Sequence, residues 1–229
     1  ENATVPLADL SFEKGSEWHG QRHTLNKLAK DGSVFRILSE EEKVSVLHRI
    51  KEISEEWLKS KQGHEKGFSL GFFSEEYICN FKIAVVERNG EIQAFANFWT
   101  SADKNEVSPD MMRYMDNAPS DTMEFLFLSL ILWAKEDGYA YFDLGMAPLS
   151  GLRGGPHGSL WGRTAEMLYE YGNVFYNFQG LREYKEKYKP IWESRYVAFP
   201  HELSLPAVLA AAAVLISKGP RGIKPVVVK

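Results

Sequence analysis

The chain has 229 residues, of which 44% are hydrophobic and 13% aromatic, so it supplies enough apolar side chains for a folded core and is not a disordered segment. Its formal net charge of −4 excludes a general polyanion-binding protein, and any contact with nucleic acid or anionic lipid must use local basic patches. A single cysteine, Cys79, excludes an internal disulfide and a thiolate metal site, and it indicates a reducing, cytoplasmic environment.

The N-terminal quarter of the chain predicts a linker followed by two helices and a strand. Residues 1–10 have no periodicity and are interpreted as a linker, and because the chain begins at Glu1 we expect it to be part of a longer protein. Apolar residues at helical spacing predict a short basic helix over 17–30, and residues 34–38 predict a strand. Beyond them, a Ser39-to-Glu42 capping-box pattern and an apolar stripe predict a helix from about 40 to 60.

A β-hairpin is predicted over 81–99, because two β-rich runs flank Arg88-Asn-Gly90, which supplies the positive φ angles of a tight turn. Residues 104–114 predict a third strand. Proline has no amide hydrogen to donate, so Pro109 indicates that this strand either lies at an edge of the sheet or carries a bulge.

The second half of the chain predicts alternating helices and strands. Asp121 and Glu124 form another capping-box pattern ahead of an almost wholly apolar helix that ends at Gly138. Strands are predicted over 139–144, 174–178 and 192–199, and helices over 159–171 and 180–188. This order of elements favours one α/β domain with a mixed sheet flanked by helices.

The C-terminal segment is apolar over 203–216, a length of about fourteen residues that falls short of the roughly 20 needed to cross a bilayer. No acidic residue follows Glu202, whereas four basic residues do. We interpret the segment as an amphipathic helix with a basic tail that rests on an anionic membrane face. The basic residues are Lys218, Arg221, Lys224 and Lys229.

Three patterns associated with other chemistries are set aside. Gly67-Phe-Ser-Leu-Gly71 matches the G-x-S-x-G elbow of hydrolases, with Asp143 and His157 in triad order, but the residues ahead of it are polar and form no buried strand. The glycine-rich stretch 152–158 lacks the spacing of a phosphate-binding loop. The six histidines are scattered and form no metal-ligand pair.

Two groups of charged residues remain as candidates. Asp110 and Arg113 lie three residues apart just after a proline, where a functional pair and a local salt bridge explain them equally well. The segment 181–195 intersperses Arg182, Lys185 and Lys187 with aromatic residues. That pattern suits contact with phosphate and sugar, although a surface helix of mixed charge has the same appearance.

Several long motifs, in order, carry a family resemblance. The chain resembles the C-terminal domain of the phosphatidylglycerol lysyltransferase, or multiple peptide resistance factor, family from about residue 20 to 200. The motifs cover residues 66–71, 94–97, 110–114, 122–127, 141–150 and 175–190. The resemblance implies an α/β, acetyltransferase-like (GNAT) fold with a mixed, largely antiparallel sheet, two such lobes in tandem, and a membrane region ahead of them.

On this reading the chain has three parts. Residues 1–38 are a linker and basic helix joined to an absent first lobe, 39–200 form the transferase lobe, and 201–229 form the C-terminal helix and tail. The resemblance implies transfer of an aminoacyl group from aminoacyl-tRNA to a glycerol hydroxyl of phosphatidylglycerol. It favours lysyl over alanyl as the group transferred. The reaction would occur at the cytoplasmic face of a bacterial membrane and would give resistance to cationic antimicrobial peptides. It would need no cofactor and no metal. The implied partners are aminoacyl-tRNA, the lipid, and the N-terminal lobe and membrane region of the same protein.

The resemblance favours catalytic roles for Asp110, Arg113 and Lys185. Asp110 would pair with the substrate ammonium group or orient Arg113, and Lys185 would bind a phosphate or a developing negative charge. Positions 110, 143 and 185 are then expected at one edge of the sheet. Substrate contacts are expected from Asp143, Ser150, Arg182, Lys187 and Glu124.

Two alternatives remain open at this point. One is a CoA-dependent N-acyltransferase of the same fold, although the loop at Arg153 lacks the Q/R-x-x-G-x-G/A signature of such enzymes. The other is a non-catalytic lobe that docks tRNA or the membrane.

Overall fold

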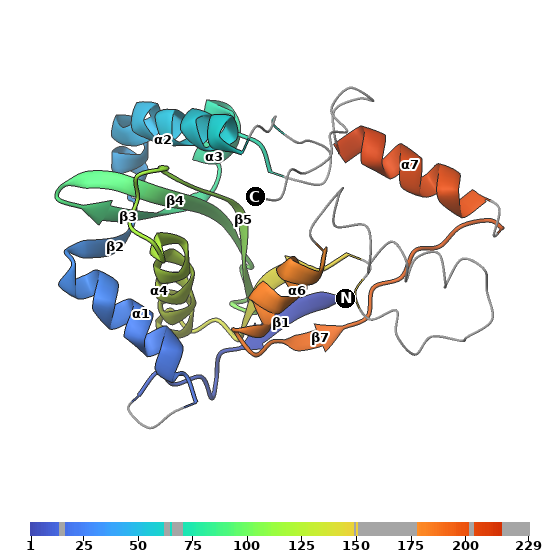
Figure 1. Ribbon diagram of the computed structural model, residues 1–229, viewed down its shortest axis with the longest axis horizontal. Coiled ribbons are helices and arrows are strands. Elements are labelled where there is room, and N and C mark those ends of the chain that lie inside the picture. Colours follow the sequence, from blue (N-terminus) through green and yellow to red (C-terminus); the bar gives the residue numbers. More distant parts are fainter. Residues whose placement is uncertain are drawn as a thin grey trace. The chain divides into compact units, whose positions relative to one another are not determined.

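The computed structural model describes residues 1–13, 17–61, 65, 71–148, 150, 178–201 and 204–216. The chain divides into two compact units (Figure 1). Unit 1 contains Glu1–Val5 and the described residues from Asp143 onward, and unit 2 contains the described residues between Pro6 and Phe142. The predicted α/β class is confirmed, because the strands form a mixed, mostly antiparallel sheet accompanied by helices.

Unit 2 contains four strands that pair antiparallel in the order β2-β3-β4-β5, and the first two residues of β6 pair parallel with β5. The predicted hairpin is confirmed, with Asn89 and Gly90 at φ angles of 55° and 79° in its turn. The bounds are β2 Ser33–Ile37, β3 Lys82–Arg88, β4 Glu91–Thr100, β5 Glu106–Tyr114 and β6 Tyr141–Met146.

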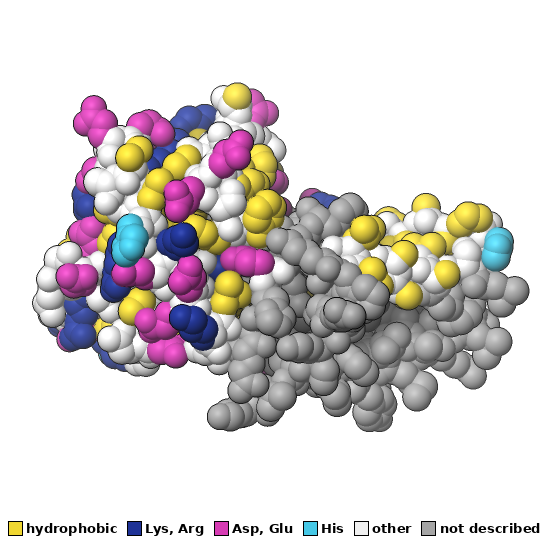
Figure 2. Space-filling view, turned by 90° about the horizontal axis from the view of Figure 1, so that it is seen from above, with side chains coloured by type: hydrophobic (Ala, Val, Ile, Leu, Met, Phe, Trp, Pro, Cys, Tyr) yellow, Lys and Arg dark blue, Asp and Glu magenta, His cyan; other side chains and the backbone are white. Residues whose placement is uncertain are grey.

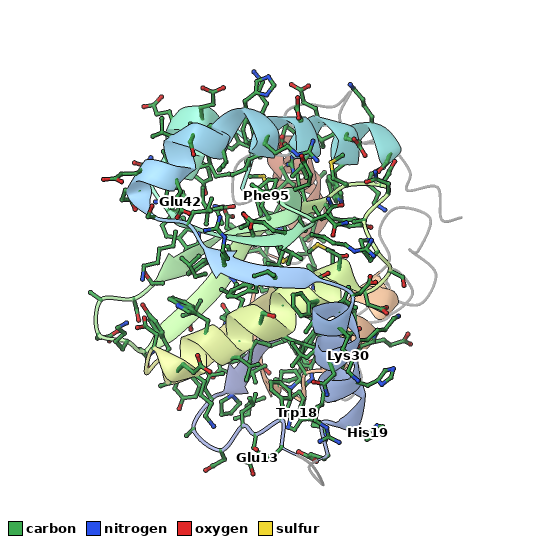
Figure 3. The ribbon with its side chains drawn as sticks, turned by 90° about the vertical axis from the view of Figure 1, so that its left-hand side faces the viewer. Glu13, Trp18, His19, Lys30, Glu42 and Phe95 are labelled. Carbon is green, nitrogen blue, oxygen red and sulfur yellow. The ribbon has the colours of Figure 1, made fainter. Side chains whose placement is uncertain are left out.

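Helices cover both faces of the sheet of unit 2. Helices α2 (Glu40–Ser60) and α3 (Glu75–Cys79) lie on one face, and α1 (His19–Lys30) and α4 (Thr122–Glu136) lie on the other (Figures 1 and 3). Phe95, labelled in Figure 3, is buried on the α2 side with Ile50 and Ile53. Helix α4 is buried over most of its surface, as its nearly continuous apolar sequence predicts.

One of the two predicted capping boxes is present. At the start of α2, Glu42 N donates to Ser39 Oγ at 3.2 Å and Ser39 N donates to a Glu42 carboxylate oxygen at 2.8 Å. The box predicted at Asp121 is wrong, because Asp121 has a left-handed backbone with φ of 72° and its side chain makes no cap hydrogen bond. Its carboxylate instead pairs with Lys27 Nζ of α1 at 2.7 Å.

Unit 1 corrects the linker interpretation of the N-terminus. Strand β1 (Asn2–Pro6) begins at the second residue, and its first three residues pair antiparallel with β7 (Ile191–Glu193). The strand predicted over 192–199 corresponds to β7, which begins one residue earlier and ends at Glu193. Helix α6 (Phe178–Glu186) confirms the helix predicted over 180–188.

Helix α7 (Leu205–Ile216) is apolar along its whole length and is not the amphipathic helix that we expected. Val208, Leu209 and Leu215 are exposed on it, and Figure 2 shows hydrophobic side chains over its surface. Among the helices that the described residues form, none combines the length and apolarity required to span a bilayer.

Some predictions lie outside the described residues. They are the serine of the G-x-S-x-G pattern, the glycine-rich stretch with His157, the helix over 159–171, the strand over 174–178 except for Phe178 at the start of α6, and the basic tail. The predicted domain boundaries at residues 38 and 200 stay predictions.

Candidate functional site

Strand β5 carries a bulge at Asp110. Asn97 of β4 pairs with Met111, and the next residue, Phe98, pairs with Pro109, so Asp110 has no partner of its own in the ladder. The strand pairs with β4 on one side and β6 on the other, which selects the bulge over the edge position that Pro109 also allowed. A bulge redirects a side chain out of the regular alternation of the strand, here that of Asp110.

The Asp110 carboxylate is held by two neutral donors through one of its oxygens. Tyr77 Oη of α3 donates to Oδ2 at 3.0 Å, and Asn97 Nδ2 donates to the same oxygen at 2.8 Å. Asn97 is fully buried, and its Oδ1 accepts from Met111 N at 3.1 Å, so one amide bridges the bulge. The residues that the structure describes donate no hydrogen bond to Asp110 Oδ1.

Gly71 lies directly against this carboxylate. A Cβ atom at position 71 would be 2.4 Å from each carboxylate oxygen of Asp110, well inside van der Waals contact. The chain therefore passes Asp110 at this distance only with glycine at position 71. Asp110, Tyr77, Asn97 and Gly71 are called the Asp110 cluster below.

Tyr77 is a permanent donor in this cluster. Burial, followed by the hydrogen bond to Asp110, raises the pKa of the Tyr77 hydroxyl to about 12. The phenol therefore keeps its proton at neutral pH and directs it at Asp110 Oδ2.

Arg113 lies two positions beyond Met111 and is only 4% exposed. Its Nη1 and Nη2 donate to the two Glu65 carboxylate oxygens at 2.7 and 2.8 Å, and Nη1 also donates to Ser54 Oγ of α2. The guanidinium lies over the Trp57 ring at 5.2 Å. Among the described residues, no hydrogen bond or ion pair joins Arg113 to Asp110, so Arg113 connects β5 to α2 and to Glu65.

In unit 1, Lys185 of α6 is 7% exposed and donates to two backbone carbonyls at the end of β6, Gly145 O at 2.9 Å and Met146 O at 2.7 Å. Burial lowers the pKa of the Lys185 ammonium to about 8, and the charge of Asp143 opposes this shift in part. An ammonium group has three donors, and these two carbonyls are its partners in the described part of the chain.

A polar turn at the end of β6 lies beside Lys185. Asp143 Oδ1 accepts from Gly145 N and from Asn2 Nδ2 of β1, both at 2.8 Å. Gly145 has a φ of 79°, a left-handed conformation that favours glycine. Ser150 is buried, and its Oγ donates to Ala147 O at 2.7 Å.

The remaining candidates lie apart from these contacts. Arg182 stacks on the Trp192 ring at 4.2 Å and pairs with Glu186 at 3.0 Å, and the Lys187 ammonium is 5.3 Å from the Tyr184 ring centre. Glu124 lies in the first turn of α4 in unit 2, where the helix dipole favours negative charge.

The predicted residues thus form two sets, one in each unit. Unit 2 contains the Asp110 cluster, Arg113 and Glu124, and unit 1 contains Lys185, Asp143, Ser150, Arg182 and Lys187. Sequence reasoning gave no role to Tyr77, Asn97, Gly71 or Glu65. Asn97 could have been noticed in the sequence, because it is a polar residue within a largely apolar predicted strand. In the structure this strand pairs with the strand that contains Pro109.

The two sets suit ligand groups of opposite charge. The Asp110 carboxylate, whose Oδ1 receives no hydrogen bond from the described residues, suits a cationic group. The buried Lys185 ammonium, which uses two of its three donors within the described residues, suits a negatively charged oxygen. No group of three or more histidine, cysteine, aspartate or glutamate side chains that could hold a metal ion occurs in the described ranges.

The fold and these clusters define an α/β domain with charged side chains at a bulged strand and at a strand end. The family model described as "Phosphatidylglycerol lysyltransferase, C-terminal" matches residues 1–199. The chain belongs to this family, as its motifs predicted.

Named relatives and solved structures agree with this assignment. The chain is 38% identical to a phosphatidylglycerol lysyltransferase of Bacillus subtilis and 34% identical to one of Staphylococcus xylosus, over 95% and 90% of its own length. It spans about a quarter of the length of these relatives, 25% and 24% respectively.

Two solved structures are similar to nearly the whole chain. A C-terminal domain assigned to a lysylphosphatidylglycerol synthetase from Agrobacterium fabrum superposes with a TM-score of 0.83 at 36% identity, over 97% of this chain and 67% of that one. The structure of L-PGS from Bacillus licheniformis gives a TM-score of 0.79 at 37% identity, over 95% and 66% of the two chains.

Proposed function

We propose that this chain is part of an enzyme that transfers an aminoacyl group, most simply lysyl, from aminoacyl-tRNA to phosphatidylglycerol. The observation that carries the proposal is the family match over residues 1–199, with relatives named phosphatidylglycerol lysyltransferase. Because the chain spans a quarter of those relatives, the reaction is assigned to the longer protein to which the chain contributes.

The proposed reaction is a transesterification. A glycerol hydroxyl oxygen of the lipid attacks the ester carbonyl carbon of the aminoacyl-tRNA and forms a new C–O bond. The C–O bond to the tRNA ribose breaks, and the proton of the glycerol hydroxyl ends on the ribose oxygen. The donor ester is already activated, so holding both reactants together and stabilising negative charge on the carbonyl oxygen are the main catalytic tasks.

We assign Asp110 to the ammonium group of the amino acid. Tyr77 and Asn97 fix Oδ2 of the carboxylate, and Oδ1 remains available with respect to the described residues. In this proposal Arg113 is a positioning residue and does not contact the substrate. Its ion pair with Glu65 and its hydrogen bond to Ser54 hold the bulged strand against α2.

Lys185 is assigned to the developing negative charge on the carbonyl oxygen. Its ammonium group is buried, oriented by two carbonyls, and has a pKa of about 8, so most of it is charged at neutral pH. Asp143 and Ser150 would stabilise the turn at the end of β6 and contact the substrate there. Arg182 and Lys187 would bind phosphate, and Glu124 is kept as a substrate contact.

The proposed partners are aminoacyl-tRNA, phosphatidylglycerol at the cytoplasmic face of the membrane, and the preceding part of the same protein. Helix α7 is proposed to contact the membrane, because it exposes Val208, Leu209 and Leu215 and only basic charges follow it in the sequence. Added positive charge on the lipid would reduce binding of cationic antimicrobial peptides.

The test is a transfer assay with the full-length protein. Vesicles containing phosphatidylglycerol are incubated with radiolabelled lysyl-tRNA or alanyl-tRNA, and the label in the extracted lipid is measured. We expect labelled lipid only when both the charged tRNA and phosphatidylglycerol are present. Label that stays with the tRNA, or heat released on calorimetric titration with acetyl-CoA together with acetyl transfer, would contradict the proposal.

A further inference from the structure

The position of the Asp110 carboxylate depends on segment 71–73 in two ways. The Gly71 backbone passes so close to it that a Cβ atom there would be 2.4 Å from each carboxylate oxygen. The Phe72 ring stacks on the Tyr77 ring, with centres 5.1 Å apart and planes 15° from parallel, and the Tyr77 hydroxyl donates to Asp110 Oδ2. The segment therefore limits the carboxylate directly through Gly71 and indirectly through Tyr77.

The same segment is attached to Glu65. The Phe73 amide nitrogen donates to Glu65 Oε1 at 3.3 Å, and the Phe73 side chain packs against the core on the α2 side of the sheet. Glu65 Oε1 also accepts from Arg113 Nη1 at 2.7 Å, and Oε2 accepts from Arg113 Nη2 at 2.8 Å. One carboxylate thus joins strand β5, through Arg113, to the segment that lies against Asp110.

Arg113 is a fixed anchor for this carboxylate. Its guanidinium is buried, donates to Ser54 Oγ of α2 and lies over the Trp57 ring. A planar guanidinium that binds a carboxylate through two parallel hydrogen bonds fixes the orientation of the carboxylate as well as its distance. The direction in which Glu65 presents Oε1 to the Phe73 amide is therefore set by Arg113.

Stability alone is a poor explanation for this ion pair. Burying two charges costs hydration, so such a pair adds little net stability relative to apolar side chains of the same volume. A second bidentate pair in unit 2 provides a comparison, because Arg36 donates to the two Glu87 oxygens at 3.2 and 2.7 Å and joins β2 to β3. Within the described residues, neither Arg36 nor Glu87 forms a hydrogen bond with the Asp110 cluster.

We propose that Glu65 is a positioning residue for the Asp110 carboxylate and thereby supports the preference of the enzyme for a donor with a free amino group. The inference rests on the proposed function, in which Asp110 binds the ammonium group of the amino acid. Glu65 does not contact the substrate. It holds segment 71–73 in place, so that Gly71 and Tyr77 keep Asp110 Oδ1 directed at that group.

The test compares two donors in the lipid transfer assay with the full-length protein. One is lysyl-tRNA, and the other is lysyl-tRNA with both amino groups of the lysyl residue acetylated, which removes their charge and keeps the ester. The ratio of kcat/KM for the two donors measures the contribution of the ammonium contact. A general loss of structure lowers both values and leaves this ratio unchanged.

Glu65→Gln should lower the ratio roughly ten-fold, the change expected when one charge-assisted hydrogen bond is lost. The amide nitrogen of glutamine cannot accept a hydrogen bond, so the bidentate contact with Arg113 is broken and the segment loses its anchor. Glu87→Gln is the matched control. It breaks the other bidentate pair at a carboxylate of similar exposure, 22% against 24% for Glu65, and should leave the ratio unchanged.

A double variant keeps the test decisive if Glu65→Gln does not fold. Glu65→Leu combined with Arg113→Met replaces both charges by apolar side chains, so no unpaired charge remains buried. It also removes the acceptor of the Phe73 amide. The double variant should keep its thermal unfolding transition and should lower the donor ratio as Glu65→Gln does.

A wild-type donor ratio in these variants would overturn the inference. So would an equal fall in kcat/KM for both donors, or an equal fall in the ratio for Glu87→Gln. If the wild type forms no product from the acetylated donor, the inhibition constant of that donor against lysyl-tRNA replaces its kcat/KM in the same comparisons. Lipid product with an unchanged ratio removes only this inference, whereas a wild type that forms no lipid product from lysyl-tRNA removes the proposed function.

Discussion

The Asp110 carboxylate occupies space that is open only because residue 71 is glycine. The Cβ atom of any other residue would lie 2.4 Å from both Asp110 oxygens, so the carboxylate must move if position 71 changes. The neighbouring donors Tyr77 and Asn97 would then lose their geometry with Oδ2.

Gly71→Ala should therefore reduce lipid aminoacylation at least about ten-fold while it lowers the free energy of unfolding by only about 1–3 kcal/mol, the usual cost of overpacking. Initial rates and urea denaturation of the full-length protein measure the two effects. Gly20→Ala is the matched control, because its Cβ atom meets nothing within 4 Å on helix α1. Wild-type rates for Gly71→Ala would show that the position of Asp110 does not matter for transfer.

Lys185 makes the proposed activity dependent on pH. Burial lowers the pKa of its ammonium group to about 8, so the cation is present below that pH and is lost as the pH rises through it. If the cation stabilises negative charge on the carbonyl oxygen, kcat should fall on the alkaline side of pH 8. Rates are corrected for spontaneous ester hydrolysis measured without enzyme.

Lys185→Arg tests this assignment, because a guanidinium keeps its charge throughout that pH range. The variant should be slower at pH 7, since it cannot reproduce both carbonyl contacts, but its rate should not fall near pH 8. An alkaline fall that is identical in wild type and Lys185→Arg would assign the titration to another group.

At the scale of the element, the bulge in β5 depends on one amide. Asn97 is fully buried, donates to Asp110 and accepts from Met111 N, so it satisfies a backbone group that the interrupted ladder leaves unpaired. Its side chain therefore stabilises both the shape of the strand and the direction of the carboxylate.

Asn97→Ala should lower the free energy of unfolding by about 2–3 kcal/mol, because it leaves a buried amide and part of a carboxylate unsatisfied. Urea denaturation followed by far-UV circular dichroism measures the loss. Asn80→Ala is the control, since the exposed Asn80 amide donates to Glu76 O alone among the described residues, and its removal should cost less than about 0.5 kcal/mol. Similar losses for both variants would contradict the role of Asn97 in the bulge.

The elements that sequence patterns predicted well are those stabilised by neighbours in the chain. Helix α2 with its Ser39 cap and the hairpin of β3 and β4 depend on local periodicity and turn chemistry. Strand β1 was missed because its pairing partner β7 lies almost 190 residues away, where no local pattern reveals it. The capping box at Asp121 failed because the pairing with Lys27 of α1 and the left-handed backbone replaced it.

The candidate site was predicted only in part, because its contacts also join residues that are far apart in the sequence. Pro109 indicated a bulge, and the motifs selected Asp110 and Lys185, but the contacts that orient these groups come from elsewhere in the chain. Tyr77 lies 33 positions from Asp110, and Gly145 lies 40 positions from Lys185. Such pairings depend on tertiary packing and have no spacing pattern in the sequence.

At the scale of the whole molecule, α7 stands out because it is apolar and yet exposes several of its side chains. It contains no polar residue and exposes Val208, Leu209 and Leu215 (Figure 2). An apolar surface of this kind is stabilised by contact with another apolar phase.

Replacing Leu209 and Leu215 together by Gln should weaken association of the full-length protein with phosphatidylglycerol vesicles at least about ten-fold, because each buried leucine contributes roughly 1.5–3 kcal/mol. Vesicle co-sedimentation measures the change, and the thermal unfolding midpoint should stay within about 2 °C. Val44→Gln on α2 removes a more exposed apolar residue, at 70%, and should have no effect on sedimentation. Unchanged sedimentation of the double variant would exclude α7 as the membrane contact.

Tyr77 belongs to two structures at once, since its hydroxyl contacts Asp110 and its ring lies between Phe72 and Phe81. A rigid phenol cannot tilt at one end without moving the other, so a ligand that displaced the Tyr77 ring would also displace the hydrogen bond to the Asp110 carboxylate, with no rearrangement of the main chain. Packing around the ring and the direction of the carboxylate are therefore coupled, and a substitution at Phe72 or Phe81 should also change the hydrogen bond to Asp110.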